Sequence, residues 1–198
     1  MRRFKRALLL VTVIALALTL CACSNKNNDL AEETYTIEIE IEKYGVITAV
    51  LDAKTAPITV KNFIDLVNAD FYDGLTFHRI IEGFMMQGGD PNGDGINNEG
   101  TPTIKGEFAY NNVENNISHL RGTLSMARSS SYNSASTQFF IMHEDGLQLD
   151  GQYAAFGRVI DGMDVVDKIC ENTPTTDSNG SVPPQNRPVI KEIRIIEE

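Results

Sequence analysis

The chain has 198 residues, with 17 basic residues against 27 acidic ones and a formal net charge of −10 at neutral pH. An acidic surface repels nucleic acid and anionic lipid headgroups, so the charge disfavours a nucleic-acid partner. Cys21, Cys23 and Cys170 are the three cysteines of the sequence, and their placement provides no disulfide framework for a folded domain.

The first 22 residues have the pattern of a signal peptide. Four basic residues among the first six precede an apolar run from Ala7 to Leu20. This run of about 14 residues is short for a membrane-spanning helix, which needs roughly 20. We predict a signal peptide over residues 1–22; the alternative is an uncleaved N-terminal anchor helix.

The segment Leu20-Cys21-Ala22-Cys23 resembles the bacterial lipobox, in which small residues precede the cysteine that receives lipid. Cys23 fits better than Cys21, which would be the site only if processing is atypical, because Ala22 is small and Leu20 is bulky. A diacylglycerol plus an amide-linked acyl chain such as palmitate buries many methylenes, at about 0.8 kcal/mol each, and anchors a protein stably. We therefore predict an extracytoplasmic lipoprotein on the cell membrane; the alternative is an ordinary secreted protein.

Processing at Cys23 would remove four basic and no acidic residues, leaving a net charge of −14. Residues 23–34 are mostly polar, without hydrophobic periodicity, and are predicted to be a lipidated N-terminus followed by a flexible linker. Residues 35–198 fit one domain.

The first half of this domain begins with two predicted strands and a helix. Residues 36–42 alternate between isoleucine and polar residues, which predicts a half-buried strand with Ile37, Ile39 and Ile41 facing a core. A turn at Gly45 and a second strand over residues 46–51 complete a hairpin. Pro57 then starts a helical pattern whose apolar residues are Val60, Phe63, Ile64 and Val67.

The remainder is mostly short strands. Strands are predicted over residues 75–81, 84–87, 122–127, 138–142, 154–160 and 189–196, a second helix over 163–170, and long loops over 88–116 and 173–188. About eight strands and two helices without a βαβ rhythm favour an antiparallel barrel or a sandwich, and composition alone does not separate the two. Cys170 is predicted to be a small core residue.

Metal binding is not expected. The loop from Asp90 to Glu99 has the composition of a calcium loop, but a strand precedes it instead of the helix of an EF-hand. His119 and His143 are isolated histidines without the spacing of metal ligands.

Four motifs carry a family resemblance: FHRIIEGFMMQGGD (residues 77–90), RGTLSMAR (121–128), STQFFI (136–141) and LDGQYAAFGRVIDG (149–162). They resemble, in order and spacing, the core motifs of the cyclophilin-type peptidyl-prolyl cis-trans isomerases, and the resemblance runs from about Ile37 to Ile196. It implies a mainly β fold, a closed eight-stranded antiparallel β-barrel capped by two α-helices. It also implies a monomer that acts on proline-containing polypeptides without a cofactor.

The resemblance also implies a site. Arg79 matches the family's catalytic arginine, and Gln87 matches the glutamine that orients it and binds substrate backbone. Without the motif, Arg79 would be interpreted as a surface ion-pair residue, and the apolar residues as ordinary core. Phe84, Met85, Phe140 and Leu149 match the hydrophobic proline pocket, and Ala127, Arg128, Gln138 and Tyr153 match further substrate-binding positions.

This chain departs from the common pattern at several positions. Glu82 stands where proline is common, and Tyr153 where many relatives have histidine. Gln148 replaces a tryptophan of many eukaryotic members, which predicts weak cyclosporin binding. The cationic side chain of Arg128 is expected to favour acidic substrates, and His78 is interpreted as a structural residue.

The predicted function is isomerisation of X-Pro bonds during folding of exported proteins, without a covalent intermediate. The alternative is a non-catalytic lipoprotein that binds proline-containing peptides. A solute-binding lipoprotein is disfavoured by the short chain and the missing two-lobe βαβ pattern.

Overall fold

The computed structural model describes residues 33–96 and 101–196. The predicted signal peptide, the lipidation site Cys23 and the linker up to residue 32 lie outside these residues. Within the described part, no helix is long and apolar enough to cross a membrane.

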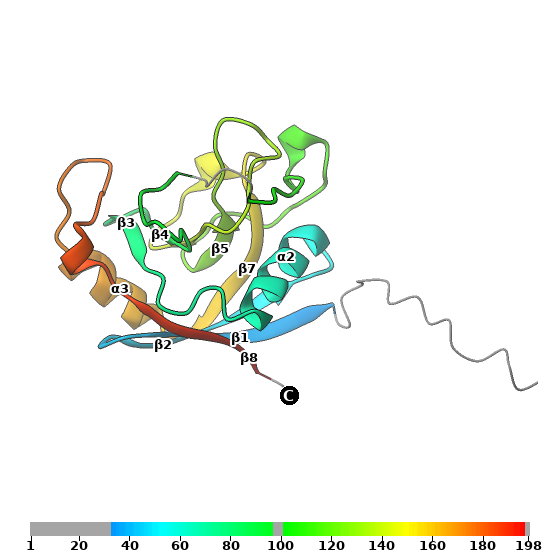
Figure 1. Cartoon of the computed structure of the whole chain (residues 1–198). Coiled ribbons are helices and arrows are strands. Elements are labelled where there is room, and N and C mark those ends of the chain that lie inside the picture. Colours follow the sequence, from blue (N-terminus) through cyan, green and yellow to red (C-terminus); the bar gives the residue numbers. More distant parts are fainter. Residues whose placement is uncertain (1–32, 97–100, 197–198) are drawn as a thin grey trace, which may run out of the picture.

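Eight antiparallel strands form one curled sheet, and two α-helices pack at opposite ends of it against the same core (Figure 1). The strands are β1 Thr34–Ile41, β2 Gly45–Asp52, β3 Phe77–Ile81, β4 Met85–Gly88, β5 Thr123–Met126, β6 Phe139–Met142, β7 Ala154–Asp161 and β8 Ile190–Ile196. The helices are α2 Pro57–Asn68 and α3 Met163–Asn172, with three short 3-10 turns at Ala109–Asn111, Leu147–Leu149 and Pro184–Asn186. The predicted mainly β class, the hairpin β1–β2 and both helices are confirmed.

The sheet is an open half-barrel and not the closed barrel that we predicted. Its order is β3-β4-β6-β5-β7-β2-β1-β8, and the edge strands β3 and β8 form no ladder with each other. Their ends meet at one isolated bridge, Thr76 with Val189, where the Gly74 N–H donates to the Ile190 carbonyl (2.8 Å), the Ile190 N–H to the Leu75 carbonyl (2.8 Å) and the Phe77 N–H to the Pro188 carbonyl (3.0 Å). The segment that precedes β8 occupies the free edge of β3 instead: the Ile80 N–H donates to the Gly180 carbonyl (2.8 Å), and the Val182 N–H to the His78 carbonyl (2.9 Å). This irregular segment thus provides hydrogen-bond partners for edge backbone groups of β3 that a neighbouring strand would pair in a closed barrel.

The main core lies on one face of the sheet, where the predicted isoleucines of β1 are fully buried. Helix α2 packs Phe63 onto this core, with its ring centroid 5.0–5.4 Å from those of Tyr72, Phe139 and Phe156. Cys170 is buried in the same core, and burial raises the pKa of its thiol to about 12. It is therefore the packing residue that we predicted.

Helix α2 has its N-terminus capped from a distant loop. Ala56 precedes the helix and offers no side-chain cap. The buried carboxylate of Glu107 instead accepts the N–H groups of Ile58 (3.0 Å) and Thr59 (2.8 Å) and the Thr59 hydroxyl (2.7 Å). A carboxylate at this position satisfies unpaired amides and interacts favourably with the helix dipole.

A second hydrophobic cluster lies on the other face of the sheet. Consecutive residues of a strand point to opposite faces, so Phe139 enters the main core while Phe140 joins Met85 and Met142 in the second cluster. Partly buried side chains pack against these three: Ile81, Phe84, Ala127, Leu149 and Tyr153. Most of this cluster consists of predicted site residues.

Candidate functional site

Strand register aligns the central polar and aromatic residues of the site in one row. Arg79 of β3 lies opposite Gln87 of β4, and Gln87 lies opposite Phe140 of β6. Residues directly opposite in an antiparallel pair present their side chains to the same face. A register shift between Phe77 and Arg79 places Arg79 in this row.

Two polar contacts fix the guanidinium of Arg79. Its Nε donates to the Asn179 carbonyl (2.9 Å), and its Nη1 donates to Gln87 Oε1 (3.2 Å) and lies 3.7 Å from Met85 Sδ. Gln87 is held in turn, because its Nε2 donates to Gln138 Oε1 (2.9 Å). Burial lowers the pKa of Arg79, but a guanidinium remains a cation at neutral pH. The site therefore holds a positive charge in a fixed orientation.

Beside Arg79 is a cavity of about 210 Å³, which we call the Arg79 pocket. This volume is below the roughly 300–1,000 Å³ of typical small-molecule sites, so it suits a single small apolar group. Its lining residues are Arg79, Phe84, Met85, Gln87, Ala127, Arg128, Phe140, Leu149 and Tyr153. Nine of the ten predicted site residues thus surround one cavity, and the tenth, Gln138, stands behind Gln87.

Arg128 forms a rigid wall of the Arg79 pocket. Its guanidinium carbon lies 5.2, 5.1 and 4.6 Å from the ring centroids of Phe108, Tyr132 and Tyr153. Its Nε and Nη2 donate to the Gln152 carbonyl at 3.0 and 2.9 Å, and Nη1 donates to the carbonyl of Ser129 (2.8 Å). The guanidinium of Arg128 is thus held by these partners and does not extend freely into solvent. The preference for acidic substrates stays a prediction. The aromatic partners Phe108 and Tyr132 escaped the sequence reasoning, because they come from distant loops.

His119 supports the pocket from behind. Its ring stacks on Phe140 with centroids 6.0 Å apart, and its two nitrogens lie 2.9 Å from Asp150 Oδ1 and 3.0 Å from Ser125 Oγ. Burial lowers the pKa of His119, while Asp150 opposes this shift. A serine, a histidine and an aspartate in this order suggest a hydrolase, but the Ser125 and His119 side chains are fully buried and cannot attack a substrate. The sequence showed His119 only as an isolated histidine.

The Asp90 loop uses its carboxylate to form a turn. Asp90 Oδ2 accepts the Gly95 N–H (2.6 Å) and Oδ1 accepts the Asn92 N–H (3.3 Å). Glu99, the last acidic residue of the loop, lies outside the described residues. Within residues 33–96 and 101–196, no group of three or more His, Cys, Asp or Glu side chains is placed to hold a metal ion.

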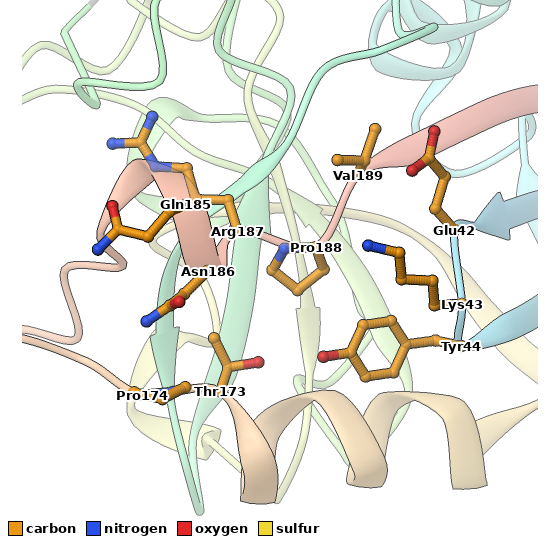
Figure 2. A pocket seen from close by; sticks show the side chains of 10 residues that line it. All are labelled: Glu42, Lys43, Tyr44, Thr173, Pro174, Gln185, Asn186, Arg187, Pro188 and Val189. Carbon is orange, nitrogen blue, oxygen red and sulfur yellow. The ribbon is translucent and has the colours of Figure 1, made fainter.

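A second hollow of about 250 Å³ lies between the β1–β2 turn and the segment 173–189 (Figure 2). The hydroxyls of Tyr44 and Thr173 point toward each other across it, and Pro188 lies nearby. It shares no lining residue with the Arg79 pocket. The segment 173–189 nevertheless connects the two places, because its Asn179 carbonyl holds Arg79.

Comparison with known proteins agrees with the geometry. The family profile "Cyclophilin type peptidyl-prolyl cis-trans isomerase/CLD" matches residues 36–196. The chain is 47% identical over 132 residues to peptidyl-prolyl cis-trans isomerase A of Dickeya dadantii (64% of this chain, 67% of the relative). It is 44% identical over 124 residues to peptidyl-prolyl cis-trans isomerase B of Escherichia coli (58% of this chain, 71% of the relative). A crystal structure of a Cryptosporidium parvum cyclophilin-type isomerase, determined in the presence of the dipeptide Ala-Pro, superposes with a TM-score of 0.71 at 32% identity (82% of this chain, 99% of that one).

Proposed function

Because the chain belongs to the cyclophilin-type peptidyl-prolyl cis-trans isomerases, we propose that the Arg79 pocket catalyses isomerisation of X-Pro bonds in polypeptides. The observation that carries this proposal is a guanidinium fixed by Gln87 and Asn179 beside a small apolar cavity. The solved relative crystallised with Ala-Pro supports proline-containing substrates.

The chemistry that the site must supply is stabilisation of a twisted peptide bond. Resonance gives the C–N bond partial double-bond character, and the barrier to rotation is about 18–20 kcal/mol. In the twisted state the prolyl nitrogen regains a lone pair and can accept a hydrogen bond. A donor aimed at that nitrogen binds the twisted state more strongly than the planar one, and every 1.36 kcal/mol of that difference raises the rate tenfold.

Arg79 is suited to be this donor. Its Nε is occupied by Asn179 and its Nη1 by Gln87, so among the residues that the structure describes Nη2 is left to donate from a guanidinium that is already oriented. The donor needs no reorientation during the reaction, which is the condition for strong electrostatic stabilisation. Phe84, Met85, Phe140 and Leu149 enclose the pyrrolidine ring and hold one side of the bond while the other rotates.

The cellular setting is proposed on sequence grounds. We place the protein outside the cytoplasm, anchored through lipid on Cys23, where it accelerates folding of exported chains as a monomer. Uncatalysed proline isomerisation takes 10–100 s at 25 °C and can limit folding. Fatty-acid labelling of wild-type cells is expected to mark the protein, and labelling that persists in Cys23→Ser would contradict this anchor.

The activity is tested by NMR exchange on an X-Pro peptide with the purified full chain. Wild type is expected to accelerate exchange, and Arg79→Ala is expected to lower kcat/KM by about a hundredfold or more, as loss of one transition-state donor does elsewhere. Arg158→Ala is the matched control, because Arg158 is an exposed arginine on β7. A folded wild type without activity would instead favour the alternative, a lipoprotein that only binds proline-containing peptides.

A further inference from the structure

The position of Phe84 depends on the tight turn between β3 and β4. The Phe84 N–H donates to the Ile81 carbonyl (3.0 Å), and Gly83 adopts a positive φ of 75° that suits glycine. The Phe84 ring lines the Arg79 pocket, yet its backbone belongs to this exposed turn. Anything that fixes the turn therefore fixes one wall of the pocket.

His143, directly after β6, contacts this turn on both sides of Phe84. Its ring Nδ1 accepts the Gly83 N–H (2.9 Å), and its backbone N–H donates to the Phe84 carbonyl (2.9 Å). The His143 side chain is buried, so little solvent competes for these bonds. Phe84 is thus bracketed by two hydrogen bonds to a single residue.

The ring of His143 is held in one orientation. Because Nδ1 accepts a hydrogen bond from a backbone amide, the proton of the neutral ring resides on Nε2. Nε2 lies 3.3 Å from Asp167 Oδ1 without a hydrogen bond between them, and Arg121 Nη2 donates to Asp167 Oδ2 (2.8 Å) and lies 2.7 Å from Oδ1. Arg121 also donates Nη1 to the His143 carbonyl (2.6 Å). Asp167 of α3 and Arg121 before β5 thus surround His143, and in this arrangement its acceptor Nδ1 faces Gly83.

We propose that His143 is a positioning residue for Phe84, and that its Nδ1 holds the proline-binding wall of the Arg79 pocket through the Gly83 N–H. The proposal rests on the isomerase function of that pocket. Phe84 contacts the pyrrolidine ring in the planar and twisted states alike, so a loosened wall weakens both equally. Such uniform binding changes KM and leaves kcat nearly unaltered.

Two variants of nearly equal size separate the acceptor from the rest of the side chain. His143→Asn places an amide oxygen where Nδ1 lies and keeps the acceptor, whereas His143→Gln places its amide near Nε2 and loses it. We expect KM of His143→Asn within about twofold of wild type and KM of His143→Gln raised about fivefold, the effect of one lost hydrogen bond, with kcat within about twofold in both. Equal KM values in the two variants, or a loss confined to kcat, would overturn the proposal.

Amide hydrogen exchange at Gly83 gives a readout that needs no activity. Gly83 is exposed, so its N–H exchanges rapidly unless Nδ1 protects it. Protection is expected in wild type and His143→Asn and is lost in His143→Gln. An unprotected Gly83 N–H in wild type overturns the proposal even if a variant fails to fold. If wild type lacks isomerase activity while Gly83 stays protected, the proposed function fails and the role of His143 in fixing Phe84 stands.

Discussion

Arg79 owes its orientation to partners from three different parts of the chain. Gln87 comes from the neighbouring strand, Asn179 from the segment before β8, and Gln138 acts through Gln87. Holding a long side chain in one rotamer costs conformational entropy. Because these partners order the Arg79 side chain when the domain folds, that entropy is not lost again during the reaction. The same logic applies on the opposite wall, where carbonyls and aromatic rings fix Arg128.

Replacing Arg128 with lysine tests whether the shape of the guanidinium or only its positive charge stabilises the domain. We expect Arg128→Lys to lower the free energy of unfolding by about 2 kcal/mol, because an ammonium cannot bond both the Gln152 and Ser129 carbonyls while stacking on the rings. Urea unfolding followed by circular dichroism measures this change. Arg158→Lys, on the exposed face of β7, serves as the control and is expected to change nothing measurable. Equal unfolding free energies for Arg128→Lys and wild type would show that charge alone matters.

At the scale of elements, the segment 173–189 acts as a substitute strand. It pairs with β3 through Gly180 and Val182, and its Asn179 carbonyl reaches Arg79. Asp177 organises the turn by accepting the Ser181 N–H (3.0 Å) and hydroxyl (2.9 Å). The open edge of the half-barrel is therefore part of the site, since the chain that covers β3 also orients the proposed catalytic group.

Gly180→Ala tests this coupling. Gly180 has φ 82°, and an added Cβ would lie 2.2 Å from the Ile80 carbonyl oxygen, so the segment must move away from β3. We expect a loss of about 2–3 kcal/mol in unfolding free energy and a drop in kcat of about tenfold, because Asn179 would no longer hold Arg79. Urea unfolding and the NMR exchange assay measure the two effects.

Gly74→Ala is the matched control for this substitution. Gly74 has a similar φ of 78°, but no atom of the described part of the chain lies within 4 Å of its added Cβ. The expected cost is therefore only the left-handed strain of about 1–2 kcal/mol, with kcat unchanged. If both variants lose kcat equally, the segment does not orient Arg79.

The sequence predicted those elements whose cause is local. The alternation of Ile37, Ile39 and Ile41 identified β1, and Pro57 marked the first turn of α2. The pocket residues came from the family resemblance, because no periodicity distinguishes Phe140 in a pocket from Phe139 in the core. Contacts between distant segments were missed: the Glu107 cap on α2 spans 48 residues or more. Such contacts depend on how strand register brings distant segments together, and register is a property of the folded sheet.

At the scale of the whole molecule, the two faces of the sheet divide stability from function. The main core on one face joins every strand and both helices, and the smaller cluster on the other face forms the Arg79 pocket. The domain also buries histidines outside the two hydrophobic clusters. His78 is 6% exposed and neither of its ring nitrogens has a partner among the described residues, while His119 is fully buried behind Phe140.

These two histidines should make the stability of the domain fall on mild acidification. Burial is the main cause that lowers the pKa of both; for His78, Asp90 and Asp94 oppose the shift while Arg187 and Arg79 add to it. The unfolded chain, with a histidine pKa of about 6.5, therefore binds more protons than the folded one. Stability is fully present above pH of about 6.5 and is lost as the pH falls toward the folded pKa values, by at most about 1.4 kcal/mol per pH unit for each histidine.

Urea unfolding between pH 7.5 and 5.5 isolates this effect, since carboxylates with a lowered pKa, such as Asp150 and Asp177, lose their contribution only below pH of about 4. We expect the unfolding free energy of wild type to fall by about 1–2 kcal/mol across this window. His78→Leu cannot titrate and leaves no unpaired ring nitrogen in the interior, so its decline should be about half as steep. A decline of equal slope in His78→Leu and wild type would show that protons reach His78 as easily in the folded domain as in the unfolded chain.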